Sequence, residues 1–107
     1  MPNSVSIDDD LAAAPAVINP ISNYPNPFSN STTLRLDLAK GGELHLSVYD
    51  LKGRKVRELL QTRKSAGTFE LTWDATDDKG KKLASGIYFV RMRLDGKSYS
   101  KKLSIVH

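Results

Sequence analysis

The alternation of apolar and polar residues is the feature that most constrains how this chain can fold. From Thr32 onward, apolar side chains recur at every second position within short segments. Successive side chains of a β-strand point to opposite faces, so each segment predicts a strand with one buried face. The clearest apolar sets are Leu34, Leu36 and Leu38, then Leu44, Leu46 and Val48, then Phe69, Leu71 and Trp73, and then Tyr88, Val90, Met92 and Leu94.

Turn signals separate these segments. Asp50–Gly53 and Ser65–Gly67 each supply a glycine for a tight turn, and Asp95-Gly96 is the strongest two-residue hairpin signal in the chain. A less regular strand is expected over Val56–Leu60 and a final strand over Lys97–Val106. The chain is therefore predicted to be all-β, an immunoglobulin-like antiparallel β sandwich of about seven strands.

The composition fits one globular domain. The chain has 107 residues, of which 26% are charged and 39% are hydrophobic. That length suffices for one hydrophobic core without covalent cross-links. The chain has no cysteine, which excludes a disulfide framework and thiolate chemistry. No apolar run approaches the roughly 20 residues that a membrane-spanning helix needs.

Positive charge is distributed along the chain. The net charge of +4 would suit an anionic partner. The basic residues are expected in a strand (Arg54, Lys55 and Arg57), in two loops (Arg63 and Lys64; Lys79, Lys81 and Lys82) and late in the chain (Arg91, Arg93, Lys101 and Lys102). Because they form no single block, they are typical of a solvated β surface, and nucleic acid is not an expected partner.

The first 22 residues predict a linker from an upstream domain. Asp8-Asp9-Asp10 and the small residues of Ala12–Pro15 suit a polar tether. Neither a basic segment nor an apolar core follows Met1, so no signal peptide is expected. We expect residues 1–22 to be this linker and residues 23–107 to be a C-terminal β-sandwich domain.

The entry to the domain is predicted at Asn23–Phe28. Pro25 and Pro27 flank Asn26, fix φ at their own positions and exclude a helix. The segment is therefore extended or turned, and both aromatic neighbours, Tyr24 and Phe28, are expected to anchor it on the core.

No constellation of residues predicts catalysis. His45 lies on the expected solvent face, His107 is the last residue given, and no cysteine or second histidine is placed to share a metal ion with His45. Ser85-Gly86 has neither a nucleophile-elbow pattern nor a partnered base. We therefore expect no enzyme activity and no cofactor.

The acidic loop Asp74–Asp78 has some likeness to a calcium loop. An EF-hand requires glycine at the sixth position and glutamate at the twelfth. Counted from Asp74, these positions hold Lys79 and Ser85, so the match fails. The favoured interpretation is a turn in which Asp side chains accept backbone N–H bonds, and weak calcium binding is the alternative.

Short motifs follow one another in a fixed order from Asn23 to the end. They are Tyr24-Pro25-Asn26-Pro27-Phe28, Leu46–Arg54 with Asp50 and Gly53, Trp73-Asp74, Leu83–Arg91 with Gly86 and Tyr88, and Lys101-Lys102-Leu103. Their order and spacing resemble the C-terminal sorting domain of the type IX secretion system, found on proteins exported by Bacteroidota. The chain is similar also to the immunoglobulin-like domain of the flagellar hook-capping protein. It ends in His107 where the sorting family often has Lys or Arg.

The resemblance implies a secretion and cell-surface sorting signal. Such a domain is recognised by the type IX translocon after Sec export. A surface sortase then removes it and transfers the cargo to an anionic lipopolysaccharide. The implied partners are the translocon, the sortase components and the cargo domain upstream, and cleavage would fall before Asn23.

The last strand is the expected recognition element. A strand at a chain end can lie at a sheet edge, where its backbone groups are available for pairing with a receptor. The candidate recognition residues are Lys101, Lys102, Leu103 and Ile105, together with Gly86 and Tyr88. Lys101 interrupts an otherwise apolar row. Its charge either guards the edge against aggregation or, with Lys102, meets acidic groups on the translocon.

Two other classes of function remain open. The first is a structural immunoglobulin-like module, either of a hook cap or as a passive spacer in a surface protein. The second is a carbohydrate-binding module, which generally needs exposed aromatic side chains. Trp73 alternates with core residues and is predicted to be the central core aromatic, which argues against the second class.

Overall fold

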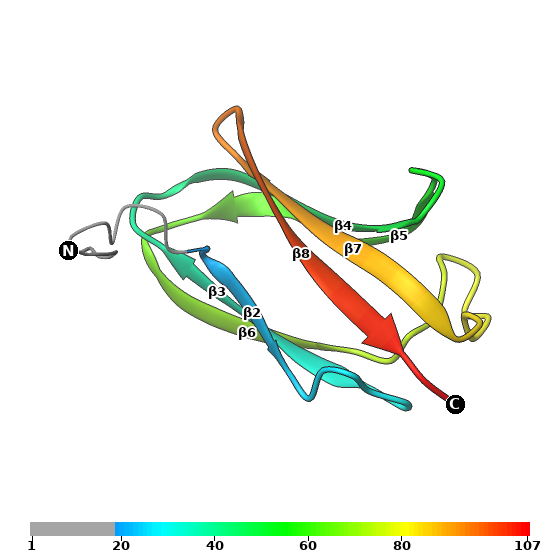
Figure 1. Cartoon of the computed structure of the whole chain (residues 1–107). Coiled ribbons are helices and arrows are strands. Elements are labelled where there is room, and N and C mark those ends of the chain that lie inside the picture. Colours follow the sequence, from blue (N-terminus) through cyan, green and yellow to red (C-terminus); the bar gives the residue numbers. More distant parts are fainter. Residues whose placement is uncertain (1–18) are drawn as a thin grey trace, which may run out of the picture.

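The computed structural model describes residues 19–107 as two facing antiparallel sheets (Figure 1). One sheet has the order β2-β3-β6 and the other β5-β4-β7-β8. The strands are β2 (Ile21–Tyr24), β3 (Thr32–Leu38), β4 (Gly42–Asp50), β5 (Lys55–Lys64), β6 (Gly67–Trp73), β7 (Gly86–Leu94) and β8 (Lys97–Ile105). The described residues contain no helix, and thus none that could cross a membrane. The predicted all-β immunoglobulin-like sandwich is confirmed.

The core lies between the sheets, and most of its buried residues belong to the alternating sets, with Ile21, Phe28 and Ala75 in addition. Leu34 and Leu36 of β3, and Leu46 and Val48 of β4, are fully buried. Trp73 is only 1% exposed, which confirms it as a core aromatic. Each such side chain removed from water contributes about 1.5–3 kcal/mol, so the period-two pattern supplies most of the driving force for this fold.

The strand β5 is longer than the sequence predicted. It continues to Lys64, so Arg63 and Lys64 lie in a strand and not in a loop. Arg63 pairs with Glu43 across the sheet, and the Lys64 ammonium lies 4.6 Å from the centre of the Phe69 ring. Two register shifts against β4 break the alternation of β5, which explains why its pattern is irregular in the sequence.

The turns follow the expected chemistry. The Gly53 N–H donates to the Asp50 carbonyl at 3.0 Å, and Gly53 has a φ of 82°. Arg54 belongs to this turn and not to the following strand, because its N–H and its Nε both donate to the Asp50 carboxylate at 2.9 Å. The hairpin between β7 and β8 turns at Asp95 and Gly96, whose φ values of 49° and 84° fit a type I′ turn.

The described sandwich begins before Asn23. Ile21 starts β2, pairs with Leu36 and is 2% exposed. Ile21 and Ser22 thus belong to a sheet, although both fall in the expected linker of residues 1–22. The expected tether motifs at Asp8–Asp10 and Ala12–Pro15 lie outside the described residues.

Candidate functional site

The strand β8 lies at one edge of the four-stranded sheet, as predicted (Figure 1). Within its sheet it pairs only with β7, and Gly86 lies opposite Ile105 while Tyr88 lies opposite Leu103. Two candidate recognition residues, Gly86 and Tyr88, are therefore brought next to the strand that carries the other four. Tyr88 is 8% exposed, and its hydroxyl donates to the Ala84 carbonyl at 2.8 Å.

The two faces of β8 differ in what they offer a partner. Leu103 and Ile105 are buried in the core, where they fix the strand to the sandwich. Lys101 lies on the same face, opposite Val90 of β7, and is half-buried. Lys102 is exposed on the outer face. Of the two lysines, Lys102 is the more accessible to a receptor.

The outer edge of β8 is covered, which corrects the expectation that its backbone groups are available. The Asn26 side chain donates to the Lys102 carbonyl at 3.3 Å and accepts from the Ser104 N–H at 3.0 Å. The Phe28 N–H donates to the Ser104 carbonyl at 3.0 Å, and the Val106 N–H donates to the Phe28 carbonyl at 2.9 Å. These bonds satisfy backbone groups that an edge strand would otherwise expose to water or to other chains.

A second asparagine extends this cover toward the start of β8. The Asn19 side-chain amide donates to the Ser100 carbonyl at 2.7 Å, and its oxygen accepts from the Ile21 N–H at 2.9 Å. We call Asn19, Asn26 and Phe28 the edge cover. All three lie within residues 19–28, so the start of the described chain shields the edge of the last strand.

Phe28 anchors this segment, as the sequence predicted. It is 3% exposed, and its ring meets that of Trp73 edge to face, with centroids 5.9 Å apart. The peptide bonds before Pro25 and Pro27 are both cis.

The expectation for Tyr24 is wrong, because its side chain is 82% exposed. Ile21 and Asn23 occupy the inward positions of β2, and the period of two therefore turns Tyr24 outward.

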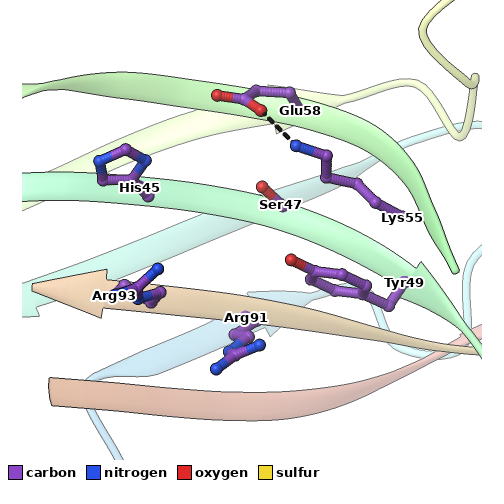
Figure 2. Close-up of a pocket in the computed structure, with 7 residues that line it drawn as sticks. All are labelled: His45, Ser47, Tyr49, Lys55, Glu58, Arg91 and Arg93. Carbon is purple, nitrogen blue, oxygen red and sulfur yellow. Dashed lines mark hydrogen bonds and ion pairs between the residues drawn. The ribbon is translucent and has the colours of Figure 1, made fainter. Parts of the chain in front are cut away.

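A polar depression lies on the outer face of the four-stranded sheet, and Figure 2 shows its side chains on β4, β5 and β7. It is lined by His45, Ser47, Tyr49, Lys55, Glu58, Arg91 and Arg93. Lys55 is paired with Glu58 at 2.8 Å. Arg91 and Arg93 belong to none of the four ion pairs between residues 19 and 107. His45 was expected on this face, but the grouping was not predicted, because such a grouping depends on how three strands align.

The acidic loop is organised as a turn. The Asp77 carboxylate accepts the N–H groups of Lys79 and Lys81, each at 2.9 Å. Donation from the Lys81 backbone N–H holds the pKa of Asp77 below its ordinary value. Asp74 accepts from the Thr76 hydroxyl, which lowers the pKa of Asp74 in the same way. These contacts agree with the favoured interpretation of the loop, and no group of three or more metal-ligating side chains occurs in the described part of the chain.

Trp73 is not available as a platform for sugars. Its indole N–H donates to the Thr76 carbonyl at 3.0 Å, inside the sandwich. Tyr24 is the one strongly exposed aromatic ring among the described residues. The burial of Trp73 therefore agrees with the argument against a carbohydrate platform built on that side chain.

Comparison with known proteins identifies a family. The sequence model described as the FlgD Ig-like domain matches residues 26–98. The match ends early in β8, so Lys101–Ile105 lie beyond it. No curated protein sequence matches the chain significantly.

Solved structures from two groups share the fold. The chain is similar to a part of dimeric latent PorU from Porphyromonas gingivalis, with 26% identity over 80% of the chain and a TM-score of 0.64. It is also similar to FlgD from P. aeruginosa, with 25% identity over 71% of the chain and a TM-score of 0.53. PorZ, described as an essential surface component of the type-IX secretion system of P. gingivalis, shares the fold at 22% identity over 81% of the chain, with a TM-score of 0.56.

The lengths covered differ between these neighbours. The chain spans 9% of PorU, 11% of PorZ and 60% of P. aeruginosa FlgD. It therefore corresponds to a small part of the first two proteins and to the larger part of the third.

Proposed function

The chain belongs to the FlgD Ig-like domain family, and we propose that within this family it acts as a C-terminal sorting domain. In this role it directs a secreted cargo protein through the type IX translocon to the cell surface or the medium. The motifs that run in order from Tyr24 to Leu103 carry the proposal. The likeness to parts of PorU and PorZ supports it, because PorZ is itself a surface component of that secretion system.

The proposed domain has no catalytic role and uses no cofactor. The folded sorting domain includes Ile21 and Ser22 of β2, so it begins slightly earlier than residue 23. The residues before it connect it to the cargo, and the surface sortase cuts within that connection. The protein passes through the periplasm and ends at the cell surface or outside the cell. Its partners are the translocon, the sortase components and the cargo domain.

The geometry of β8 suggests how recognition works. Leu103 and Ile105 hold the strand against the core, and Gly86 and Tyr88 of β7 support it from the neighbouring position. Lys102 is then exposed on the outer face, and Lys101 is half-buried on the inner face. Recognition therefore depends on two lysines that an ordered strand presents, with the buried residues acting through the fold.

A fusion experiment tests the proposal. Residues 19–107 are joined behind a signal peptide and a fluorescent reporter in a bacterium that has the type IX system. The double change Lys101→Ala with Lys102→Ala should abolish surface delivery while the domain stays folded, because partly exposed lysines contribute little to stability, about 0.5 kcal/mol. Lys79→Ala with Lys81→Ala is the matched control, since it removes two exposed positive charges from a loop remote from β8 in the sequence. Equal delivery by both double variants would remove the lysines from the recognition site.

A structural module is the second candidate function. The family match itself favours this function. So does the likeness to P. aeruginosa FlgD, because the chain spans 60% of the length of that protein. A FlgD from Xanthomonas campestris, described in connection with the hook capping essential for flagellar assembly, shares the fold with 22% identity over 80% of the chain and a TM-score of 0.56. In this case the folded fusion would stay in the periplasm of a secretion-competent host.

A further inference from the structure

The edge cover consists of two kinds of contact with different strengths. Phe28 is buried and pairs through its backbone with Ser104 and Val106, so this end of the edge is held by the core. Asn19 and Asn26 make exposed bonds through side-chain amides. A bond that water can reach on both sides contributes little net stability, about 1 kcal/mol, and opens readily.

The exposed part of the cover bonds to residues of β8 whose backbone groups point away from β7. Ser100 and Lys102 direct their carbonyls to Asn19 and Asn26, and the N–H of a strand residue points to the same side as its carbonyl. The N–H groups of Ser100 and Lys102 therefore also point outward, and Ser98 shares their orientation by the period of two. Side-chain amides replace a neighbouring strand only in part, since between Ser98 and Lys102 they meet only the carbonyls of Ser100 and Lys102.

The outer face beside this edge carries charge of one sign. Arg91 lies opposite Ser100, and Arg93 lies opposite Ser98. With Lys102 they are the charged side chains on this face of β7 and β8. An added strand would run about 4.8 Å from β8, which is within reach of Lys102 and of the long Arg91 side chain. Acidic side chains on the outer face of that strand would match this charge.

The direction of an added strand is also indicated. Phe28 and Ile105 form a parallel bridge, so the chain beside β8 already runs in the same direction as β8. An added strand would run in the same direction as the chain at Phe28. This strand would end before the position beside β8 that Phe28 occupies.

We propose that the outer edge of β8 from Ser98 to Lys102 is a docking surface for an extended segment of a partner protein. The segment has acidic side chains on its outer face, runs parallel to β8, and displaces the side chains of Asn19 and Asn26 while Phe28 stays in the core. The proposal rests on the proposed function only in taking this partner to be a component of the secretion machinery. The cover keeps the edge from pairing with other copies of the chain until that segment arrives.

The test measures docking in solution, without any secretion. The probes are two fluorescein-labelled peptides, Thr-Glu-Val-Glu-Val-Glu-Thr and its lysine counterpart Thr-Lys-Val-Lys-Val-Lys-Thr. The double variant Asn19→Ala with Asn26→Ala removes the exposed cover, and Asn30→Ala is the matched control. Asn30 lies in the same region and is exposed, and its contact with the rest of the chain is made by its backbone carbonyl.

The expected result is tighter binding of the acidic peptide to the uncovered variant. Fluorescence anisotropy should give an affinity about fivefold or more above that of the parent and of Asn30→Ala, since the exposed bonds to the Ser100 and Lys102 carbonyls no longer compete with the peptide. Lys102→Ala in the uncovered variant should lower the affinity again. Hydrogen exchange should show that the peptide protects the N–H groups of Ser100 and Lys102.

Three results would overturn the inference. They are equal affinity for the parent and the uncovered variant, equal binding of the lysine peptide, or self-association of the variant without protection of Ser100 and Lys102 by the peptide. If the double variant does not fold, Asn26→Asp replaces it, because an aspartate keeps the acceptor for the Ser104 N–H and loses the donor to the Lys102 carbonyl. Because no translocon takes part, failure here would leave the export experiment untouched, and failure of export would leave this result standing.

Discussion

Replacement of Trp73 by alanine tests the description of the core most sharply. The side chain is 1% exposed and packs edge to face on Phe28. Truncating a buried tryptophan to alanine costs about 3–5 kcal/mol, because contacts are lost and a cavity remains. That loss is comparable with the whole stability of a small domain, about 5–15 kcal/mol. Loss of the Trp73–Phe28 contact would also loosen the anchor of the edge cover.

A milder change separates the ring from its polar group. Trp73→Phe keeps an aromatic ring beside Phe28 but removes the indole N–H that donates to the Thr76 carbonyl. Arg57 also donates to that carbonyl, at 3.4 Å, so the acceptor retains a partner. We expect a cost well below that of the alanine variant, about 1–2 kcal/mol, from one lost hydrogen bond and a smaller ring.

Equilibrium urea unfolding followed by circular dichroism measures both variants. The alanine variant should be largely unfolded or have a strongly lowered midpoint, and the phenylalanine variant should unfold cooperatively at an intermediate midpoint. An alanine variant within about 1 kcal/mol of the parent would refute the assignment of Trp73 to the core and would revive the carbohydrate-platform interpretation.

Three further predictions concern the acidic loop, with the Arg57 side chain that contacts it, and the turn at Gly53. Arg57→Ala should cost about 1–2 kcal/mol in urea unfolding, because its guanidinium donates to the Thr76 hydroxyl at 2.7 Å and to the Asp77 carbonyl at 3.1 Å; an unchanged midpoint would contradict this. Since the pKa of Asp77 is lowered in the folded state, its carboxylate stabilises the fold at neutral pH, and this contribution disappears as the pH falls through that lowered pKa. The urea midpoints of the parent and Asp77→Ala should therefore differ at neutral pH and converge on acidification. A difference that does not change with pH would contradict a stabilising role for the Asp77 charge. Gly53→Ala should cost about 1–2 kcal/mol by thermal unfolding, from the left-handed φ of 82° alone, since an added Cβ meets nothing within 4 Å; a much larger loss would reveal a steric role.

The alternation was enough to predict the sandwich and its core. Leu34, Leu46 and Val90 lie inside because a strand has two faces and these residues occupy one of them. The same rule applied to Ile21 would have turned Tyr24 outward. Tyr24 was instead grouped with Phe28 as part of one proline segment, and both rings were expected in the core.

The edge cover could not be predicted from local patterns. Asn26 meets the Lys102 carbonyl across 76 positions of the sequence, and Asn19 meets the Ser100 carbonyl across 81. Side chain to backbone bonds of this range depend on the final path of the chain and leave no periodic signal. The extent of β5 was obscured for a related reason, because its two register shifts move successive residues off a single face.

Delivery of a reporter by residues 19–107 tests the central claim most directly. The signal peptide, reporter and domain are expressed in two strains that differ only in a functional type IX translocon, and surface-exposed reporter is measured by its sensitivity to added protease on intact cells. The account predicts protease-sensitive or released reporter in the translocon-positive strain and periplasmic, protected reporter in the other. A folded fusion that stays protected in both strains would contradict the sorting function.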